Sequence, residues 1–119
     1  MKEIKAYVRI DIVNTVIDAL EREGFSSMTI IDVSALGRLA DPSQSKYSLE
    51  YVERYSRMAR IELVCKDKSA DHAVRIIQSS GCTHQHGDGI IFVLPVERAV
   101  KIRSNEEGNQ ILQTPSETT

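Results

Sequence analysis

Two glycines flank an aspartate in Gly87-Asp88-Gly89, the most specific local motif of the sequence, directly before an apolar run. Glycines let a backbone turn sharply and approach a ligand closely, which leaves N–H groups free to bind an anion. Gly37-Arg38, Lys101 and Arg103 add three positive charges that suit phosphate oxygens. Each of these features is also common on ordinary surfaces, so a phosphate site requires the fold to bring them together.

A second cluster, Cys82-Thr83-His84-Gln85-His86, places one thiol and two imidazoles in a short segment. Zinc sites usually need four well-placed groups of these kinds. A metal site would therefore need a further ligand, such as His72 or Cys65. The alternative is that Cys65 is buried in a strand and that the histidines lie on a loop surface.

Catalytic patterns are missing from the sequence. It has no nucleophile beside a plausible base, no carboxylate pair at a recognisable spacing and no complete phosphate-transfer motif. We therefore expect a binding or regulatory protein and not an enzyme.

Composition narrows the class of protein further. With 119 residues, 41% of them hydrophobic, the chain is long enough for one domain and one core. The net charge of −2, spread along the chain, provides no basic face for nucleic acid. No apolar run approaches the ~20 residues of a membrane span, the start does not resemble a signal peptide, and two cysteines fit a reducing compartment. We expect a cytoplasmic protein without membrane insertion.

The first half of the chain shows one strand, one helix and a second strand. Alternation over 3–9 predicts a half-buried strand, and the apolar spacing from Val13 to Leu20 predicts a helix that Gly24 ends. Residues 28–33 are rich in β-branched side chains and predict the second strand. Residues 37–57 show no clear periodicity and read as a long loop, which is more often a binding segment than filler.

The second half repeats this order. A strand is expected over 60–65, a helix over 70–81 and, from a continuous apolar run, a strand covered on both faces over 90–94. One helical turn is expected over 96–100. The polar residues 104–119 have little to bury and are expected to be disordered.

This order predicts an α+β, ferredoxin-like βαββαβ fold with a long loop between the second and third strands. The folded domain should cover residues 1–103. The sheet face away from the helices would need a cover, so we also expect the chain to oligomerise.

The sequence resembles the PII signal-transduction proteins, the nitrogen regulatory protein P-II-like family, without a gap from about Lys2 to Arg103. The residues that carry the resemblance are Gly24, Met28-Thr29, Val33, Gly37-Arg38, Glu50-Tyr51, Ile61-Glu62, Thr83, Gly87-Asp88-Gly89, Ile91-Phe92-Val93 and Arg103. The resemblance implies a homotrimer with nucleotide clefts between neighbouring subunits. It also implies that residues 37–57 form the T-loop, which meets a target protein such as a transporter, an enzyme or a carboxysome component.

The resemblance also implies a set of nucleotide-binding residues. Matching positions around the nucleotide are Thr29, Gly37, Arg38, Glu62, Gly87, Asp88 and Gly89, with Glu62 near the adenine end. Lys101 and Arg103 match two basic positions that hold phosphates from across the subunit interface. The usual residue at the first of these is Arg, so Lys101 keeps the charge but lacks the bidentate fork.

Three departures from the family pattern change the expected ligand. At the position of Leu39 the family has a Gln that helps to hold the Mg²⁺-ATP and 2-oxoglutarate complex. At the position of Met58 it has a Lys that pairs with the 2-oxoglutarate carboxylate, and at the position of Ile90 a Lys that meets the terminal phosphates. Apolar side chains cannot offset buried phosphate or carboxylate charge. We therefore expect no 2-oxoglutarate sensing and a preference for ADP or AMP over ATP.

The T-loop and a second effector complete the expectations. Tyr47, Tyr51 and Arg54 are candidate partner contacts, because exposed tyrosines bring large contact area at low entropic cost. Tyr51 matches a position that is uridylylated in many family members. By analogy with PII-like proteins associated with carboxysomes or bicarbonate transport, bicarbonate is a candidate second anion near Arg38 and Arg57. The alternatives are a nucleotide-independent scaffold and a metal-responsive regulator.

Overall fold

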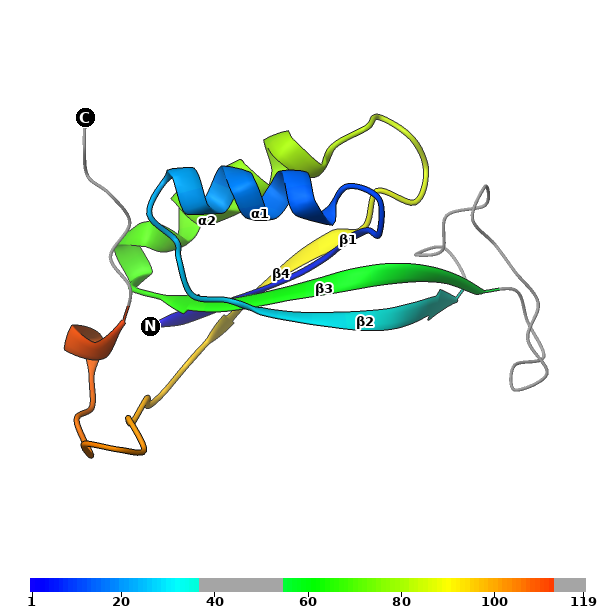
Figure 1. Cartoon of the computed structure of the whole chain (residues 1–119). Coiled ribbons are helices and arrows are strands. Elements are labelled where there is room, and N and C mark those ends of the chain that lie inside the picture. The colour runs from blue at the N-terminus through cyan, green and yellow to red at the C-terminus, as the bar shows by residue number, and fades with distance from the viewer. Residues whose placement is uncertain (37–54, 113–119) are drawn as a thin grey trace.

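The computed structural model describes residues 1–36 and 55–112 (Figure 1). Its elements follow the order strand, helix, strand twice over, with one further short helix near the end. They are β1 (Lys2–Arg9), α1 (Val13–Arg22), β2 (Thr29–Leu36), β3 (Tyr55–Cys65), α2 (Asp67–Gly81), β4 (Ile90–Pro95) and the 3-10 helix η3 (Asn109–Ile111). The predicted βαββαβ order is confirmed.

The four strands form one antiparallel sheet in the order β2-β3-β1-β4. The central strand β1 pairs with β3 on one side and with β4 on the other, so Ile4 lies opposite both Leu63 and Val93. Both helices cover the same face of the sheet (Figure 1). The two halves of the chain therefore share one core between this face and the helix pair.

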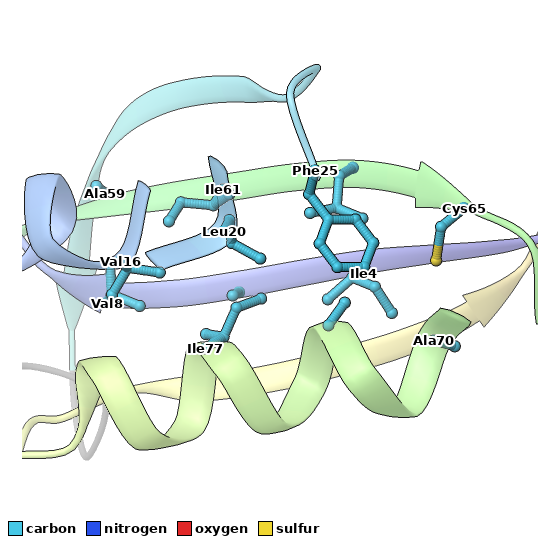
Figure 2. Packing of buried hydrophobic residues seen from close by; sticks show 13 residues of the cluster. Ile4, Val8, Val16, Leu20, Phe25, Ala59, Ile61, Cys65, Ala70 and Ile77 are labelled. Atoms are coloured by element: carbon cyan, nitrogen blue, oxygen red, sulfur yellow. The ribbon is translucent and has the colours of Figure 1, made fainter. Parts of the chain in front are cut away.

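The core is formed by apolar side chains from α1, α2 and the facing side of the sheet (Figure 2). Val16 and Leu20 of α1 and Ile4 and Ile61 of the sheet are all 0% exposed. Burying one such side chain contributes about 1.5–3 kcal/mol relative to leaving it in water. This core fixes the strands and hence the loops at both ends of the sheet.

The opposite face of the sheet is open in the single chain. We expected β4 to be covered on both faces, but Ile90 and Phe92 on the open face are each 46% exposed. Val93, which pairs with the buried Ile4 and so lies on the helix side, is 48% exposed. β4 is an edge strand, and among the described residues no second layer packs over the open face. The continuous apolar run of β4 is therefore only partly buried within one chain.

Pairing lengthens the two strands that flank the long loop. β2 runs to Leu36 and β3 begins at Tyr55, since the two strands pair along their whole length up to these residues. The predicted loop of residues 37–57 is therefore shorter by its last three residues. Predictions that concern Gly37, Arg38, Leu39, Tyr47, Tyr51 and Arg54 lie outside the described residues.

The helical turn predicted over 96–100 is wrong. Residues 96–99 have no regular secondary structure, and Val100 forms an antiparallel bridge with Glu107. The Lys101 amide donates to the Glu106 carbonyl at 2.8 Å, which closes a hairpin that the five-residue local pattern could not reveal. Residues 104–112, expected to be disordered, instead complete this hairpin and form η3.

Neither of the two α-helices in the described ranges has the length and apolar character needed to cross a membrane.

Candidate functional site

Asp88 lies at the centre of a hydrogen-bond network that shapes the loop between α2 and β4. The Arg9 Nε atom donates to Asp88 Oδ1 at 2.8 Å, and the Thr83 amide donates to Asp88 Oδ2 at 2.8 Å. The Thr83 hydroxyl also donates to Oδ1. A second Arg9 nitrogen donates to the His86 carbonyl at 2.7 Å. The buried Arg9 guanidinium therefore binds the loop at both His86 and Asp88.

This network controls the charge of Asp88. Burial by itself would raise the pKa of the carboxyl group, but the hydrogen bonds from Thr83 and Arg9 and the Arg9 charge outweigh it. The net result is a pKa well below the ordinary range for aspartate. Asp88 is therefore ionised at all physiological pH values.

The two glycines of the loop have backbone conformations that other residues rarely adopt. Gly87 and Gly89 have φ angles of 98° and 103°. A Cβ atom on Gly89 would lie 1.7 Å from the Tyr7 carbonyl oxygen, so the loop rests directly on β1. A loop fixed in this way can present backbone N–H groups to an anion.

The structure shows which groups Asp88 contacts within its own chain. The family resemblance places Asp88 among the nucleotide contacts, which stays a prediction, and its two oxygens accept hydrogen bonds from Arg9 and Thr83. Asp88 is thus placed to position Gly87 and Gly89. Arg9 was not among the site residues predicted from the sequence. The only sequence feature that could have pointed to it is its charge at the end of a half-buried strand.

Three other predicted site residues meet at the opposite end of the sheet. Thr29, Glu62 and Lys101 line a pocket of about 700 Å³, a volume suited to a small ligand. The remaining residues that line it are Glu3, Ser26, Ser27, Met28, Leu63, Val64, Ile111 and Leu112. We call it the Thr29 pocket. Ile111 and Leu112 belong to the segment that we expected to be disordered, so no sequence pattern pointed to them as site residues.

Glu62 is anchored by basic neighbours on the open face of the sheet. Its carboxylate lies 3.1 Å from Arg60 Nε and 3.9 Å from Lys5 Nζ. These ion pairs hold the side chain against the sheet at the pocket wall. Arg103, by contrast, lies exposed on the hairpin turn beyond Lys101 and does not line this pocket.

A second pocket, of about 420 Å³, lies beside the Asp88 loop between α2 and β4. It is lined mainly by apolar side chains, and Asp88 and Gly89 form part of its rim. Its lining residues are Tyr7, Val8, Val74, Ile77, Gln78, Gly81, Cys82, Asp88, Gly89, Ile90 and Ile91. We call it the α2–β4 groove.

The predicted site residues thus form two groups at opposite ends of the molecule. The Thr29 pocket includes Glu3 at the start of β1, whereas Arg9 at the end of β1 binds the Asp88 loop. Six residues of extended strand span about 20 Å. Figure 1 shows the loop after α2 and the hairpin before η3 at opposite ends. Within a single chain the residues of each group therefore lie close to one another, but the two groups lie far apart.

Two of the three departures from the family pattern are part of the Asp88 end. Met58 is 1% exposed, and its methyl group would lie 3.3 Å from a Cβ atom on Gly89. Ile90 lines the α2–β4 groove and is 46% exposed. Apolar side chains therefore border the loop where the family pattern has two lysines.

The structure offers little for a metal ion. Cys82 Sγ lies 3.6 Å from His84 Nδ1, but no three His, Cys, Asp or Glu side chains within residues 1–36 and 55–112 could hold a metal. His72 instead stacks on Phe25, and Cys65 is buried in the core. Burial raises the pKa of the Cys65 thiol, which makes it a poor ligand.

Comparisons with known proteins identify the family. The model of the family "Nitrogen regulatory protein P-II" matches residues 1–106. The chain is 32% identical over 112 residues to the nitrogen regulatory protein P-II of Azospirillum brasilense, which covers 94% of this chain and 100% of that protein. It is 34% identical over 110 residues to the P-II protein of Pyropia yezoensis, covering 89% of this chain and 95% of that protein. The fold, the matched length and these identities show that the chain belongs to the P-II family of nitrogen regulatory proteins.

Proposed function

We propose that this P-II signalling protein binds an adenine nucleotide in a site that two copies of the chain complete together. P-II proteins are trimers that regulate target proteins, they are not enzymes, and they generally bind adenine nucleotides. The observation that carries the proposal is the separation of the site residues into the Thr29 pocket and the Asp88 loop at opposite ends of one sheet.

Two different surfaces that complete one site favour a head-to-tail contact. Such a contact closes into a ring when the rotation between neighbours allows it, and three copies would form three equivalent sites. The open sheet face supports this arrangement, since the exposed residues of β4 provide apolar area for a neighbour to cover.

Each half contributes its own chemistry to the ligand. The Thr29 pocket supplies a hydroxyl, the anchored Glu62 carboxylate and apolar walls, which together suit a nucleobase. Lys101 at its edge supplies a charge for phosphate, with Arg103 next to it on the turn. The Asp88 loop of the neighbour would supply backbone N–H groups, together with Gly37 and Arg38.

The apolar border of the Asp88 loop favours ADP or AMP over ATP. A terminal phosphate placed beside Ile90 and Met58 would lose water without gaining an opposite charge, which is costly. The same substitutions remove the partner for a 2-oxoglutarate carboxylate. Arg57 could attract a small anion such as bicarbonate, but it already lies 3.1 Å from Asp32, with which the anion would compete.

The bound nucleotide would regulate a target through the T-loop. Gly37 and Arg38 connect the site to this segment, and Tyr47, Tyr51 and Arg54 are the candidate partner contacts. A ligand can shift the loop only by the difference in its affinity for the two loop states. Arg38→Ala should therefore weaken both nucleotide binding and the effect of nucleotide on loop protection from proteolysis.

Calorimetric titration tests the proposal. ADP, AMP and ATP are titrated separately, each with and without bicarbonate or 2-oxoglutarate. Lys101→Ala should weaken ADP binding about tenfold or more, since it removes a phosphate charge. Arg75→Ala, which removes an exposed cation from α2 outside both halves, should change it less than twofold. Failure of the wild-type protein to bind any nucleotide would favour a scaffold that acts without one.

A further inference from the structure

Ile102 is the most exposed large apolar residue among those described. Its side chain has 103% of its full accessibility, whereas the next most exposed, Val93, has 48%. It lies between two cations, Lys101 and Arg103, on a turn. An isoleucine in this position interacts with nothing in its own chain, so its apolar surface is available to another molecule.

The turn that carries Ile102 is ordered by hydrogen bonds. The Lys101 amide donates to Glu106 at 2.8 Å, and the Asn105 amide donates to the Lys101 carbonyl at 2.9 Å. Arg98 forms two hydrogen bonds to Glu107 across the base of the hairpin, each 3.2 Å long. Ile102 is therefore presented on a closed turn, which lowers the entropy lost when it is buried.

An apolar receptor of suitable size exists at the other end of the molecule. The α2–β4 groove has a volume of about 420 Å³ and includes Val8, Val74 and Ile77 in its walls. Gly89 of the Asp88 loop forms part of its rim. The hairpin and this groove lie at opposite ends of the chain (Figure 1), so Ile102 cannot enter the groove of its own chain.

We propose that Ile102 of one copy inserts into the α2–β4 groove of the neighbouring copy. This inference rests on the proposed function, in which Lys101 of one copy faces the Asp88 loop of the next. Ile102 follows Lys101 directly, and Gly89 of the Asp88 loop is one of the residues that line the groove. When the two half-sites meet around a phosphate, the apolar side chain and the apolar groove are brought together by the same contact.

The insertion gives the turn two functions. The cations beside Ile102 neutralise phosphate, while the isoleucine anchors the turn in a groove that holds no charged side chain apart from Asp88, itself paired with Arg9. The affinity of neighbouring copies and the geometry of the nucleotide site then depend on the same residue.

Disulfide trapping tests the contact with a thiol that the protein already has. Cys82 is exposed and lines the groove, whereas Cys65 is buried. With diamide as oxidant, the Ile102→Cys variant should form a disulfide to Cys82 of the next copy, which gives covalent dimers and trimers on a non-reducing gel. Ile30→Cys, a substitution at a 40% exposed residue outside the groove, should not.

The decisive control is the double variant Ile102→Cys with Cys82→Ser. Its cross-links should disappear, and cross-links that persist would show that the turns meet each other instead of the groove. Absence of cross-links in Ile102→Cys would overturn the insertion even if the wild type is a nucleotide-binding trimer. Cross-links in a protein that binds no nucleotide would leave the insertion standing and refute the proposed ligand.

A dilution experiment provides a second measurement without cysteine chemistry. Ile102→Ser should weaken assembly by at least tenfold in sedimentation of diluted samples, whereas Ile30→Ser, the same change of side chain at a 40% exposed residue outside the groove, should change it less than twofold. Equal effects of the two variants would contradict the insertion.

Discussion

Single residues decide how the loop between α2 and β4 is held. Asp88 connects to β1 through Arg9 and to the end of α2 through Thr83, and Gly89 lets the backbone lie against the Tyr7 carbonyl. The contacts with β1 join parts of the chain about 80 residues apart, as in the Arg9–Asp88 pair, whereas Thr83 and Asp88 are five residues apart. Substitutions at these positions should therefore disturb the conformation of the loop more than the packing of the core.

Gly89→Ala should destabilise the protein by about 2–4 kcal/mol in urea unfolding, since it adds both a backbone collision and φ strain. The matched control is Gly108→Ala. Gly108 has a similar φ of 95°, but a Cβ atom there would meet nothing within 4 Å. Gly108→Ala should lower the free energy of unfolding by about 1 kcal/mol. Equal losses of stability at both positions would mean that the close approach of Gly89 to Tyr7 does not matter.

Asp88→Asn should reduce stability by about 1–2 kcal/mol at neutral pH. Hydrogen bonds to a charged group are usually worth about 1.5–3 kcal/mol, and here the side chain is 23% exposed, which weakens them. The stabilisation by the ionised form is complete above the unfolded pKa of 3.8 and is lost as the pH falls towards the lower folded pKa. The difference between wild type and variant in acid titration should therefore be constant from about pH 5 to 8 and shrink below about pH 4. A difference that grows on acidification would refute this.

At the scale of elements, α1 and α2 hold the sheet through one side of each helix. Leu20 is fully buried, while Ile17 of the same helix is only partly buried against the core. Leu20→Ala should cost about 3 kcal/mol and Ile17→Ala about 1 kcal/mol in urea unfolding, because the loss follows the buried volume removed. A reversed order would show that α1 packs by a different face.

Elements also explain which predictions from the sequence were correct. Strong alternation over 3–9 and helical spacing in the two helices correspond to β1, α1 and α2, since these patterns match one buried face. The pattern over 96–100 is too short to determine a structure. There the pairing of Val100 with Glu107 outweighs local helical preference.

In the proposed function the nucleotide site belongs to two copies, so the ligand preference is a property of the whole assembled molecule. Ile90→Lys should increase ATP affinity relative to ADP about tenfold, as a cation beside the Asp88 loop would meet the terminal phosphate. Ile90 is 46% exposed, so the fold accommodates lysine. Val93→Lys, at a 48% exposed residue of the same strand, is the control and should leave the ratio unchanged. Calorimetry gives both ratios, and an unchanged ratio in Ile90→Lys would remove this residue from the phosphate site.

The amino-acid sequence alone predicts the βαββαβ order, the family resemblance and the types of residue that could bind phosphate. Periodicity and motifs are local, so they could be read without knowing which strands are neighbours. It did not reveal that Asp88 is held by Arg9, that Ile111 and Leu112 join the Thr29 pocket, or that the site residues divide between two ends of the sheet. Tertiary structure decided these features, because they depend on how strand pairing places residues that are far apart in the chain.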